Sequence, residues 1–137
     1  MDFFLKFETM ALLSVALISG GMLLYPLVQR GMGGGTASLD TLGATRLIND
    51  SNPIILDVRS PAEYSVGHLP NARNIPLDDL DKRAGELPAK RPVLLCCANG
   101  TRSARAARQL KQGGREEVFN LGGGLQAWQQ AGLPMAR

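Results

Sequence analysis

Cys97 and the six residues after it are the part of this 137-residue sequence best suited to chemistry. The thiol ends an apolar run, residues 92–97 (PVLLCC), that is typical of a buried parallel strand, and a helical stretch begins near Ser103. Ligands of an open parallel sheet bind beyond the carboxyl ends of its strands. We therefore expect Cys97 to stand at a binding site, followed by a loop that can hold an anion.

The loop, residues 98–103 (ANGTRS), is suited to keeping the sulfur ionised. Successive backbone N–H groups can turn toward one sulfur, the following helix adds the positive end of its dipole, and Gly100 permits a positive φ. Cysteine reacts as the thiolate, whose pKa falls near helix N-termini and cations, so Arg102 and Arg105 favour the same result. The alternative is a buried cysteine without function, but it gives no reason for an arginine so close to the core.

The second cysteine, Cys96, is expected to have a different role. Neighbouring residues of a strand point to opposite faces, so Cys96 should lie in the core when Cys97 faces the site. Counted from Cys96, Arg102 gives the C-x5-R spacing of cysteine-dependent phosphatases and arsenate reductases, but Gly100 then falls one position late. That reading stays an alternative. No metal site and no cofactor are expected, because His68 is the only histidine and no C-x-x-C spacing exists.

The elements that must position Cys97 alternate between short apolar runs and helical stretches. Glycine or proline bounds several of the runs, which predicts buried strands, and Ser60 before Pro61 predicts a capped helix start. Such alternation predicts an α/β fold with a central parallel sheet covered by helices on both faces. Strands are predicted at residues 53–58, 73–75, 92–97 and 117–121, and helices at residues 41–49, 61–66, 78–87, 103–112 and 125–130.

The N-terminal region differs in composition from this domain. Residues 9–29 carry no charge, and a helix over the apolar residues 10–28 would rise about 28 Å, close to the roughly 30 Å hydrocarbon core of a bilayer. The pattern predicts a transmembrane anchor over residues 1–30, a flexible glycine-rich linker over residues 31–38 and a globular domain over residues 39–137. A cleaved signal peptide and a buried core helix are the alternatives. Loop charges do not decide the orientation; because a free thiol favours reducing surroundings, we expect a single-pass membrane protein with a cytoplasmic catalytic domain.

The overall charge excludes one class of partner. The sequence holds 15 Lys and Arg against 12 Asp and Glu, a net charge of +3, with no basic tract and no aromatic platform. We therefore expect no nucleic-acid partner.

Three segments resemble, in order, the motifs of the rhodanese family. Residues 56–76 (LDVRSPAEYSVGHLPNARNIP) are similar to its D-x-R, E-Y, G-H and A-x-N-I-P run, and residues 97–103 (CANGTRS) to its C-x-x-G-x-R-S loop. Residues 120–134 (NLGGGLQAWQQAGLP) are similar to its closing L-x-G-G, W and G-L-P run. The resemblance extends over residues 38–134 and implies an α/β fold around a parallel sheet, with Cys97 as the catalytic residue.

The chemistry that this resemblance implies is sulfur transfer. The Cys97 thiolate would attack the outer sulfur of a donor such as thiosulfate, sulfite would leave, and a persulfide would remain until a thiol or a protein acceptor removes the sulfur. The implied partners are thus a small sulfur-containing anion and a sulfur acceptor, besides the membrane. A membrane-tethered persulfide carrier or binding module with little thiosulfate turnover stays open. The implied substrate-binding residues are Ala98, Asn99, Gly100, Thr101, Arg102 and Ser103.

Asp57, Arg59 and His68 are expected to support the site rather than to react. Asp57 ends a predicted strand and Arg59 is close enough to pair with it, so structural support is favoured over substrate contact. His68 follows Gly67 in a tight connection and is expected to fix the backbone. Two-domain members of the family can carry an arginine where this chain has Glu63, and the difference predicts weaker thiosulfate binding.

Overall fold

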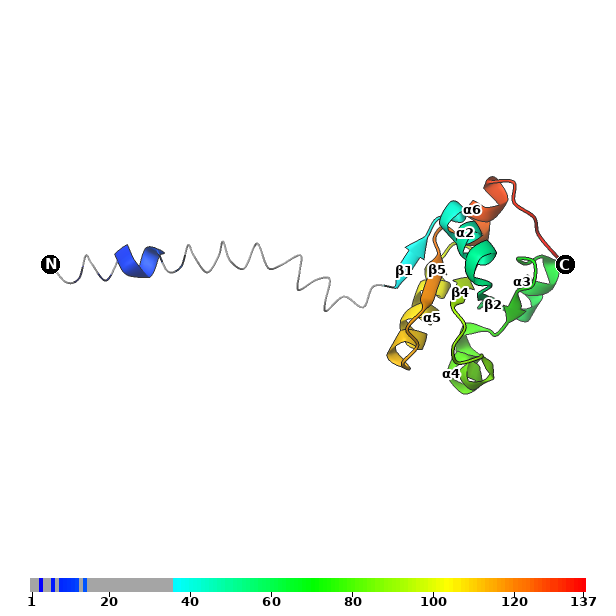
Figure 1. Cartoon of the computed structure of the whole chain (residues 1–137), viewed down its shortest axis with the longest axis horizontal. Helices are drawn as coiled ribbons and strands as arrows, with labels where there is room; N and C mark the ends of the chain where they lie inside the picture. The colour runs from blue at the N-terminus through cyan, green and yellow to red at the C-terminus, as the bar shows by residue number, and fades with distance from the viewer. Residues whose placement is uncertain (1–2, 4–5, 7, 13, 15–35) are drawn as a thin grey trace. The chain divides into compact units, whose positions relative to one another are not determined.

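A computed structural model describes residues 3, 6, 8–12, 14 and 36–137 of the chain. The chain divides into two compact units, Met1–Gly35 and Thr36–Arg137. The second unit contains the sheet (Figure 1). Cys97 and the loop that follows it belong to the same unit.

The predicted localisation, a single-pass membrane protein with a cytoplasmic catalytic domain, is contradicted. In the part of the chain that is described, no helix has both the length and the apolar character needed to cross a bilayer. Most of the predicted anchor over residues 1–30, and most of the predicted linker over residues 31–38, lies outside the described residues.

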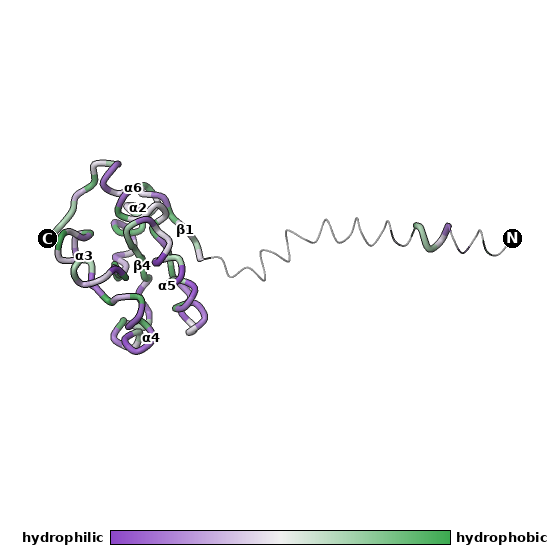
Figure 2. The backbone as a smooth tube through the Cα atoms, turned by 180° about the vertical axis from the view of Figure 1, so that it is seen from behind, coloured by the Kyte–Doolittle hydropathy of each residue, from purple (hydrophilic) through white to green (hydrophobic). Residues whose placement is uncertain are grey.

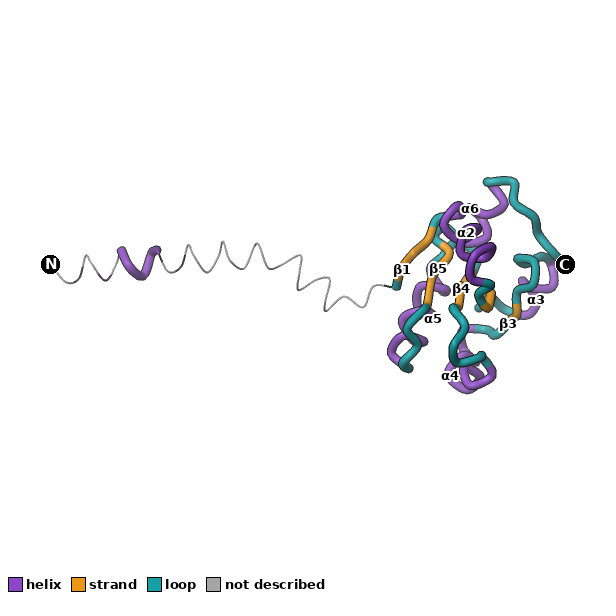
Figure 3. Tube along the Cα trace, in the orientation of Figure 1, coloured by secondary structure: helices purple, strands orange, loops and turns teal. Residues whose placement is uncertain are grey.

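The predicted α/β fold with a central parallel sheet is confirmed. Five strands lie in the order β1-β5-β4-β2-β3, and every pair of neighbours is parallel. Helices connect them (Figures 1 and 3). The strands are β1 (Ala37–Leu39), β2 (Ile54–Asp57), β3 (Arg73–Asn74), β4 (Val93–Cys96) and β5 (Val118–Leu121). The helices are α2 (Thr41–Ser51), α3 (Pro61–Val66), α4 (Leu80–Arg83), α5 (Thr101–Gln112) and α6 (Gly124–Gln130), with short 3-10 turns η1 (Leu77–Asp79) and η2 (Ala84–Glu86).

Two apolar clusters cover the two faces of the sheet. One joins β2 and β4 to α4 and α5 and contains Leu95, Leu80 and Leu110; the other lies against α2 and α6 and contains Leu94 and Trp128. Figure 3 shows α2 and α6 together on one side of the strands and α4 and α5 on the other. Since both faces are covered, the central strands are apolar throughout rather than alternating.

Helix α5 shows how a polar sequence is held on this sheet. Figure 2 colours most of it hydrophilic, yet its buried residues recur three or four positions apart and form one stripe. Those residues are Ser103, Ala106, Ala107 and Leu110. The small alanines let the helix approach β4 closely, which brings its first turn to the thiol.

The capping residues predicted the bounds of one helix, α3, correctly at both ends. Helix α3 covers Pro61–Val66 as predicted, with Ser60 as its N-cap accepting a hydrogen bond from the Glu63 N–H. The segment predicted as one helix over residues 78–87 is instead the three pieces η1, α4 and η2. Its fully buried residues, Leu80 and Leu87, give too small an apolar face to hold one continuous helix.

The sheet also reaches further toward the N-terminus than predicted. Ala37 and Ser38, assigned to the linker, belong to β1, which pairs with residues Phe119 to Leu121 of β5. The hydrogen bonds of β1 come from a strand about 80 residues away, and such long-range pairing leaves little trace in the local sequence.

Candidate active site

Cys97 directly follows the central strand of the sheet. Strand β4 lies between β2 and β5, and all three are parallel, so their carboxyl ends meet at one edge. Asp57 and Leu121 end the neighbouring strands at this edge. The predicted position of Cys97, beyond the carboxyl end of a strand, is confirmed.

The loop after Cys97 wraps hydrogen-bond donors around its sulfur. The N–H of Gly100 donates to Cys97 Sγ at 3.1 Å and the N–H of Ser103 at 3.4 Å, while Ser103 Oγ lies 3.3 Å from the same atom. Asn99 Oδ1 lies 4.0 Å from the sulfur and accepts the N–H of Thr101 at 3.1 Å. Gly100 has a φ of +93°, which an L side chain rarely adopts. The loop therefore forms an anion cradle for a single sulfur.

These hydrogen bonds favour the thiolate form of Cys97. Burial raises the pKa of Cys97, but hydrogen bonds from the Ser103 hydroxyl and from backbone N–H groups of the loop lower it by more. The net result is a pKa below the ordinary value of 9.0. Charge on Arg102 and Arg105 was predicted to have this effect; here the hydrogen bonds account for it, and Arg105 is an exposed residue.

Arg102 is engaged by a carboxylate of another element. Its Nη1 and Nη2 donate to Oε1 and Oε2 of Glu63 at 2.9 and 3.0 Å, which joins α5 to α3. The hydrogen bonds from Arg102 lower the pKa of Glu63 from 4.5 to about 2, and Ser60 contributes in the same direction. The guanidinium beside the loop is therefore already paired with a carboxylate.

Cys96 lies on the opposite face of the strand, as predicted. It belongs to the apolar cluster around α2 and α6, whereas Cys97 belongs to the cluster around α5. Burial raises the pKa of Cys96 well above its ordinary value, and the Asp57 carboxylate raises it further. The C-x5-R frame counted from Cys96 to Arg102 therefore begins at a thiol on the wrong face of the sheet.

The segment after β5 supports the loop that follows Cys97. The Leu125 N–H donates to the Cys97 carbonyl at 2.9 Å and the Gln126 N–H to the Ala98 carbonyl at 3.1 Å. Gly124 has a φ of +59°, and a Cβ there would lie 2.5 Å from the Cys97 carbonyl oxygen. Glycine at position 124 therefore lets α6 begin directly against the backbone that follows Cys97.

Asp57 and Arg59 make a buried network beside the cradle. The Arg59 Nη2 lies 2.7 Å from Asp57 Oδ2, and the Arg59 Nε donates to the same carboxylate at 3.0 Å. The Arg59 Nη2 also donates to the Gly67 carbonyl at 2.6 Å, and Asn74 Nδ2 donates to both the Asp57 and Arg59 carbonyls. The bonds tie the end of β2 to the segment after α3, which favours the structural support that the sequence predicts.

His68 is held by Tyr64 and by Ala136. Its Nδ1 lies 2.9 Å from the Tyr64 carbonyl oxygen, and its ring stacks on the Tyr64 ring with centroids 3.9 Å apart. Its backbone pairs with Ala136. Of the predicted residues 98–103, the structure brings Asn99, Gly100 and Ser103 to the Cys97 sulfur, whereas Arg102 pairs with Glu63. The hydrogen bonds of Asp57, Arg59 and His68 join these residues to one another or to the backbone.

Asn120 is a residue near the cradle that the sequence analysis did not single out. It is buried on β5, and its Nδ2 donates to the Gly100 carbonyl at 3.3 Å. The available signal was a lone polar residue within the apolar strand VFNL.

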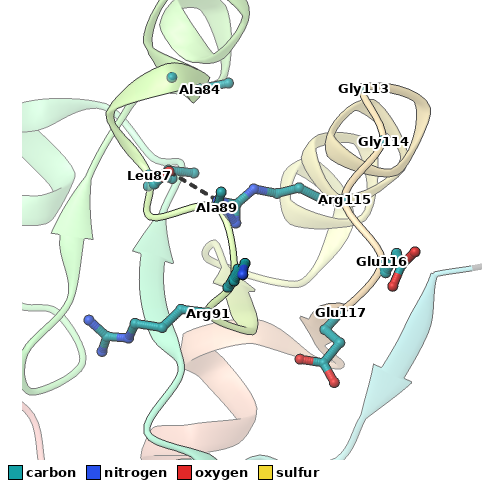
Figure 4. A pocket seen from close by; sticks show the side chains of 11 residues that line it. Ala84, Leu87, Ala89, Arg91, Gly113, Gly114, Arg115, Glu116 and Glu117 are labelled. Carbon is teal, nitrogen blue, oxygen red and sulfur yellow. Dashed lines mark hydrogen bonds between the residues drawn. The ribbon is translucent and has the colours of Figure 1, made fainter.

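A further cavity lies away from Cys97. A volume of about 580 Å³ is bounded by Arg91, Arg115 and Glu117, which are close to the amino ends of β4 and β5 (Figure 4). In Figure 4 Arg115 crosses toward the segment before β4, where its Nη2 donates to the Leu87 carbonyl at 3.1 Å. Since Cys97 stands at the carboxyl end of β4, this cavity is not part of the candidate site. Among the described residues, no three His, Cys, Asp or Glu side chains gather in a way that could hold a metal ion.

Comparisons with known proteins place the sequence among related domains. Residues 43–131 match the profile of the "Rhodanese-like domain" family. The sequence is 46% identical over 74 residues to an uncharacterized Bacillus subtilis protein, YqhL, covering 54% of this chain and 59% of that one, less than two thirds of its length. It is 38% identical over 90 residues to a protein of Allochromatium vinosum named "Sulfurtransferase", covering 66% of this chain and 84% of that protein. Among solved structures, a rhodanese-related protein of Thermoplasma volcanium superposes with a TM-score of 0.67 at 31% identity, over 73% of this chain and 97% of that one.

Proposed function

Because this chain belongs to the rhodanese-like domain family, we propose that it is a sulfurtransferase that carries sulfane sulfur as a persulfide on Cys97. The family and the sulfurtransferase of A. vinosum support a role in sulfur transfer. Thiosulfate as the donor, and a thiol or a protein as the acceptor, are the finer parts of the proposal.

The proposed reaction has two displacement steps. The Cys97 thiolate attacks the outer sulfur of thiosulfate, the sulfur–sulfur bond of the donor breaks, and sulfite leaves with the electron pair. The new bond leaves Cys97 with a terminal sulfur that carries the negative charge. An acceptor thiolate then attacks this terminal sulfur, and the Cys97 thiolate is the leaving group, so the enzyme returns to its first state. Both steps are displacements by a thiolate, and the hydrogen bonds that lower the pKa of Cys97 favour that form.

The donors around Cys97 Sγ are the observation that carries this proposal. The Gly100 and Ser103 N–H groups lie 3.1 and 3.4 Å from the sulfur, and Ser103 Oγ lies 3.3 Å from it. N–H groups directed at one point stabilise negative charge without having to reorganise during the reaction. The cradle is therefore suited to a thiolate before transfer and to an anionic persulfide after it.

The proposal is tested by comparing two serine variants. The chain is incubated with thiosulfate, and the peptide that contains Cys97 is analysed by mass spectrometry for one added sulfur atom. We expect the adduct in the natural chain and in Cys96→Ser, and no adduct and no sulfur transfer to cyanide in Cys97→Ser. Equal loss in both variants, or no adduct in the natural chain with either thiosulfate or a low-molecular-weight persulfide, would contradict the assignment.

The ion pair between Glu63 and Arg102 favours a second candidate function. Because Glu63 neutralises the guanidinium beside the loop, less positive charge is available to a dianionic donor such as thiosulfate. A persulfide carrier that receives sulfur from a less charged donor fits this arrangement. The same experiment separates the two: a carrier forms the adduct from a low-molecular-weight persulfide but turns over thiosulfate slowly.

A further inference from the structure

Asn120 is a buried polar residue in the middle of the sheet. It lies on β5 between Ser38 of β1 and Leu95 of β4, and its exposed fraction is 6%. Since strand side chains alternate, Asn120 shares a face with Val118, which belongs to the apolar cluster that contains Cys97. A polar amide at such a position costs free energy unless its hydrogen bonds are made.

Among the described residues, the side-chain amide of Asn120 makes one hydrogen bond, which is to the cradle. Its Nδ2 donates to the Gly100 carbonyl at 3.3 Å. The same carbonyl accepts the Ala104 N–H at 3.1 Å, and the Gly100 N–H donates to Cys97 Sγ at 3.1 Å. Gly100 is thus held at its carbonyl by β5 and by the first turn of α5, while its N–H is directed at the sulfur.

The side-chain oxygen of Asn120 argues against a purely structural role for this residue. Within the described part of the chain, no group donates a hydrogen bond to Asn120 Oδ1, which is buried. Leucine has a similar size, and at this position it would leave no unpaired acceptor. What asparagine supplies and leucine does not is the N–H donor to Gly100.

We propose that Asn120 is a positioning residue for the Cys97 thiolate. Through its bond to the Gly100 carbonyl it fixes the left-handed conformation of Gly100, whose φ is +93°, and so keeps the Gly100 N–H on the sulfur. The space around Gly100 supports this coupling to β5, because a Cβ there would lie 3.2 Å from the Gly123 nitrogen and 3.3 Å from the Leu121 carbonyl oxygen. The relevance to sulfur transfer rests on the proposed function, whereas the effect on the thiol does not.

The test measures the ionisation of Cys97 without any sulfur donor. Alkylation of the full chain by iodoacetamide is followed by mass spectrometry of the Cys97 peptide across a range of pH. Access and ionisation both affect the rate, so the midpoint of the pH profile is the readout. In Asn120→Leu we expect the midpoint to move toward that of an ordinary thiol and the rate at neutral pH to fall about threefold or more. Asn120→Gln, which keeps a donor, should recover part of the shift.

Two controls separate positioning from general destabilisation. Val118→Ala removes buried side-chain volume from the same face of β5 and should lower the urea midpoint of unfolding without moving the alkylation midpoint. Asn120→Ala provides the same comparison if the leucine variant does not fold. An unchanged alkylation midpoint in both Asn120→Leu and Asn120→Ala, or an equal shift in Val118→Ala, would overturn the proposal. Absence of a persulfide on the natural chain would instead count against the proposed function alone.

Discussion

The surroundings of Cys96 and Cys97 differ although the two residues are adjacent and both have an exposed fraction of 0%. Around Cys96 the sheet meets α2 and α6 through apolar side chains, and burial raises the pKa of its thiol well above the ordinary value. Around Cys97 burial also raises the pKa, yet the hydrogen bonds of the loop lower it by more. Burial therefore does not separate a core cysteine from the proposed nucleophile here; the directed donors do.

The backbone that follows β4 causes the difference between the surroundings of the two thiols. Because the chain turns away from the strand at Cys97, the N–H groups of Gly100 and Ser103 come back to its sulfur. These N–H groups do not bind the sulfur of Cys96, because the Cys96 side chain lies on the other face of the sheet, in the cluster against α2 and α6. One residue along a strand is enough to change the environment of a thiol completely.

Among the variants considered, Gly124→Ala is expected to have the largest effect on the surroundings of Cys97. The added Cβ would lie 2.5 Å from the Cys97 carbonyl oxygen and 2.7 Å from the Asn99 nitrogen, at a φ of +59°. The loop must shift or the backbone must strain, so we expect a loss of about 3 kcal/mol or more in the free energy of unfolding. We also expect alkylation of Cys97 to slow at least about tenfold at neutral pH because the cradle is displaced.

Urea unfolding and alkylation of the variant measure the two effects. Gly85→Ala is a matched control, since a Cβ at Gly85 meets nothing within 4 Å. A Gly124→Ala chain with natural stability and natural reactivity would show that the segment after β5 does not support the loop that follows Cys97.

A smaller effect is expected from Ser103→Ala, which removes one donor and leaves the backbone in place. The Ser103 hydroxyl, 3.3 Å from Cys97 Sγ, is the largest of the contributions that lower the pKa of this thiol. Its loss should raise the pKa of Cys97, so that the thiolate forms at higher pH and alkylation at neutral pH slows about tenfold, as for one charge-assisted hydrogen bond.

The pH profile of Cys97 alkylation provides the measurement. At pH values above both midpoints the natural chain and Ser103→Ala should react at similar rates, because both thiols are then ionised. Ser65→Ala is the control, since Ser65 Oγ bonds only locally, to the Ala62 carbonyl at 2.8 Å. A profile that falls equally at every pH would indicate lost access rather than lost ionisation.

Features that depend on neighbouring residues could be predicted from the sequence, whereas features that depend on distant residues could not. The turn from Ser60 into α3 was predicted to the residue, because a cap and a proline act on their own neighbours. The placement of Cys97 at the carboxyl end of a strand followed from the alternation of apolar runs and helical stretches. The partner of Arg102 could not be read in this way, since Glu63 lies 39 positions away and only the fold brings the two together. The same holds for β1 and for the bond from Asn120 to Gly100, which is 20 positions distant.

Replacement of Glu63 by glutamine tests the ion pair beside the cradle and has the smallest expected effect. The carboxylate lies 2.9 Å from Arg102 Nη1, but the two side chains are 40% and 38% exposed, so solvent screens the pair. Arg102 lowers the pKa of Glu63 from 4.5 to about 2, so the pair stabilises the fold fully above pH 4.5 and loses its effect as the pH falls toward 2. We expect Glu63→Gln to be less stable than the natural chain at neutral pH by no more than about 1 kcal/mol, and this difference to shrink at about pH 3.

Urea unfolding at both pH values measures this difference in stability, with Glu86→Gln as the control because Glu86 forms a more exposed pair with Arg83. A difference that grows on acidification would mean that Glu63 is better protonated than ionised in the fold, and the charge pair beside the cradle would then have no stabilising role.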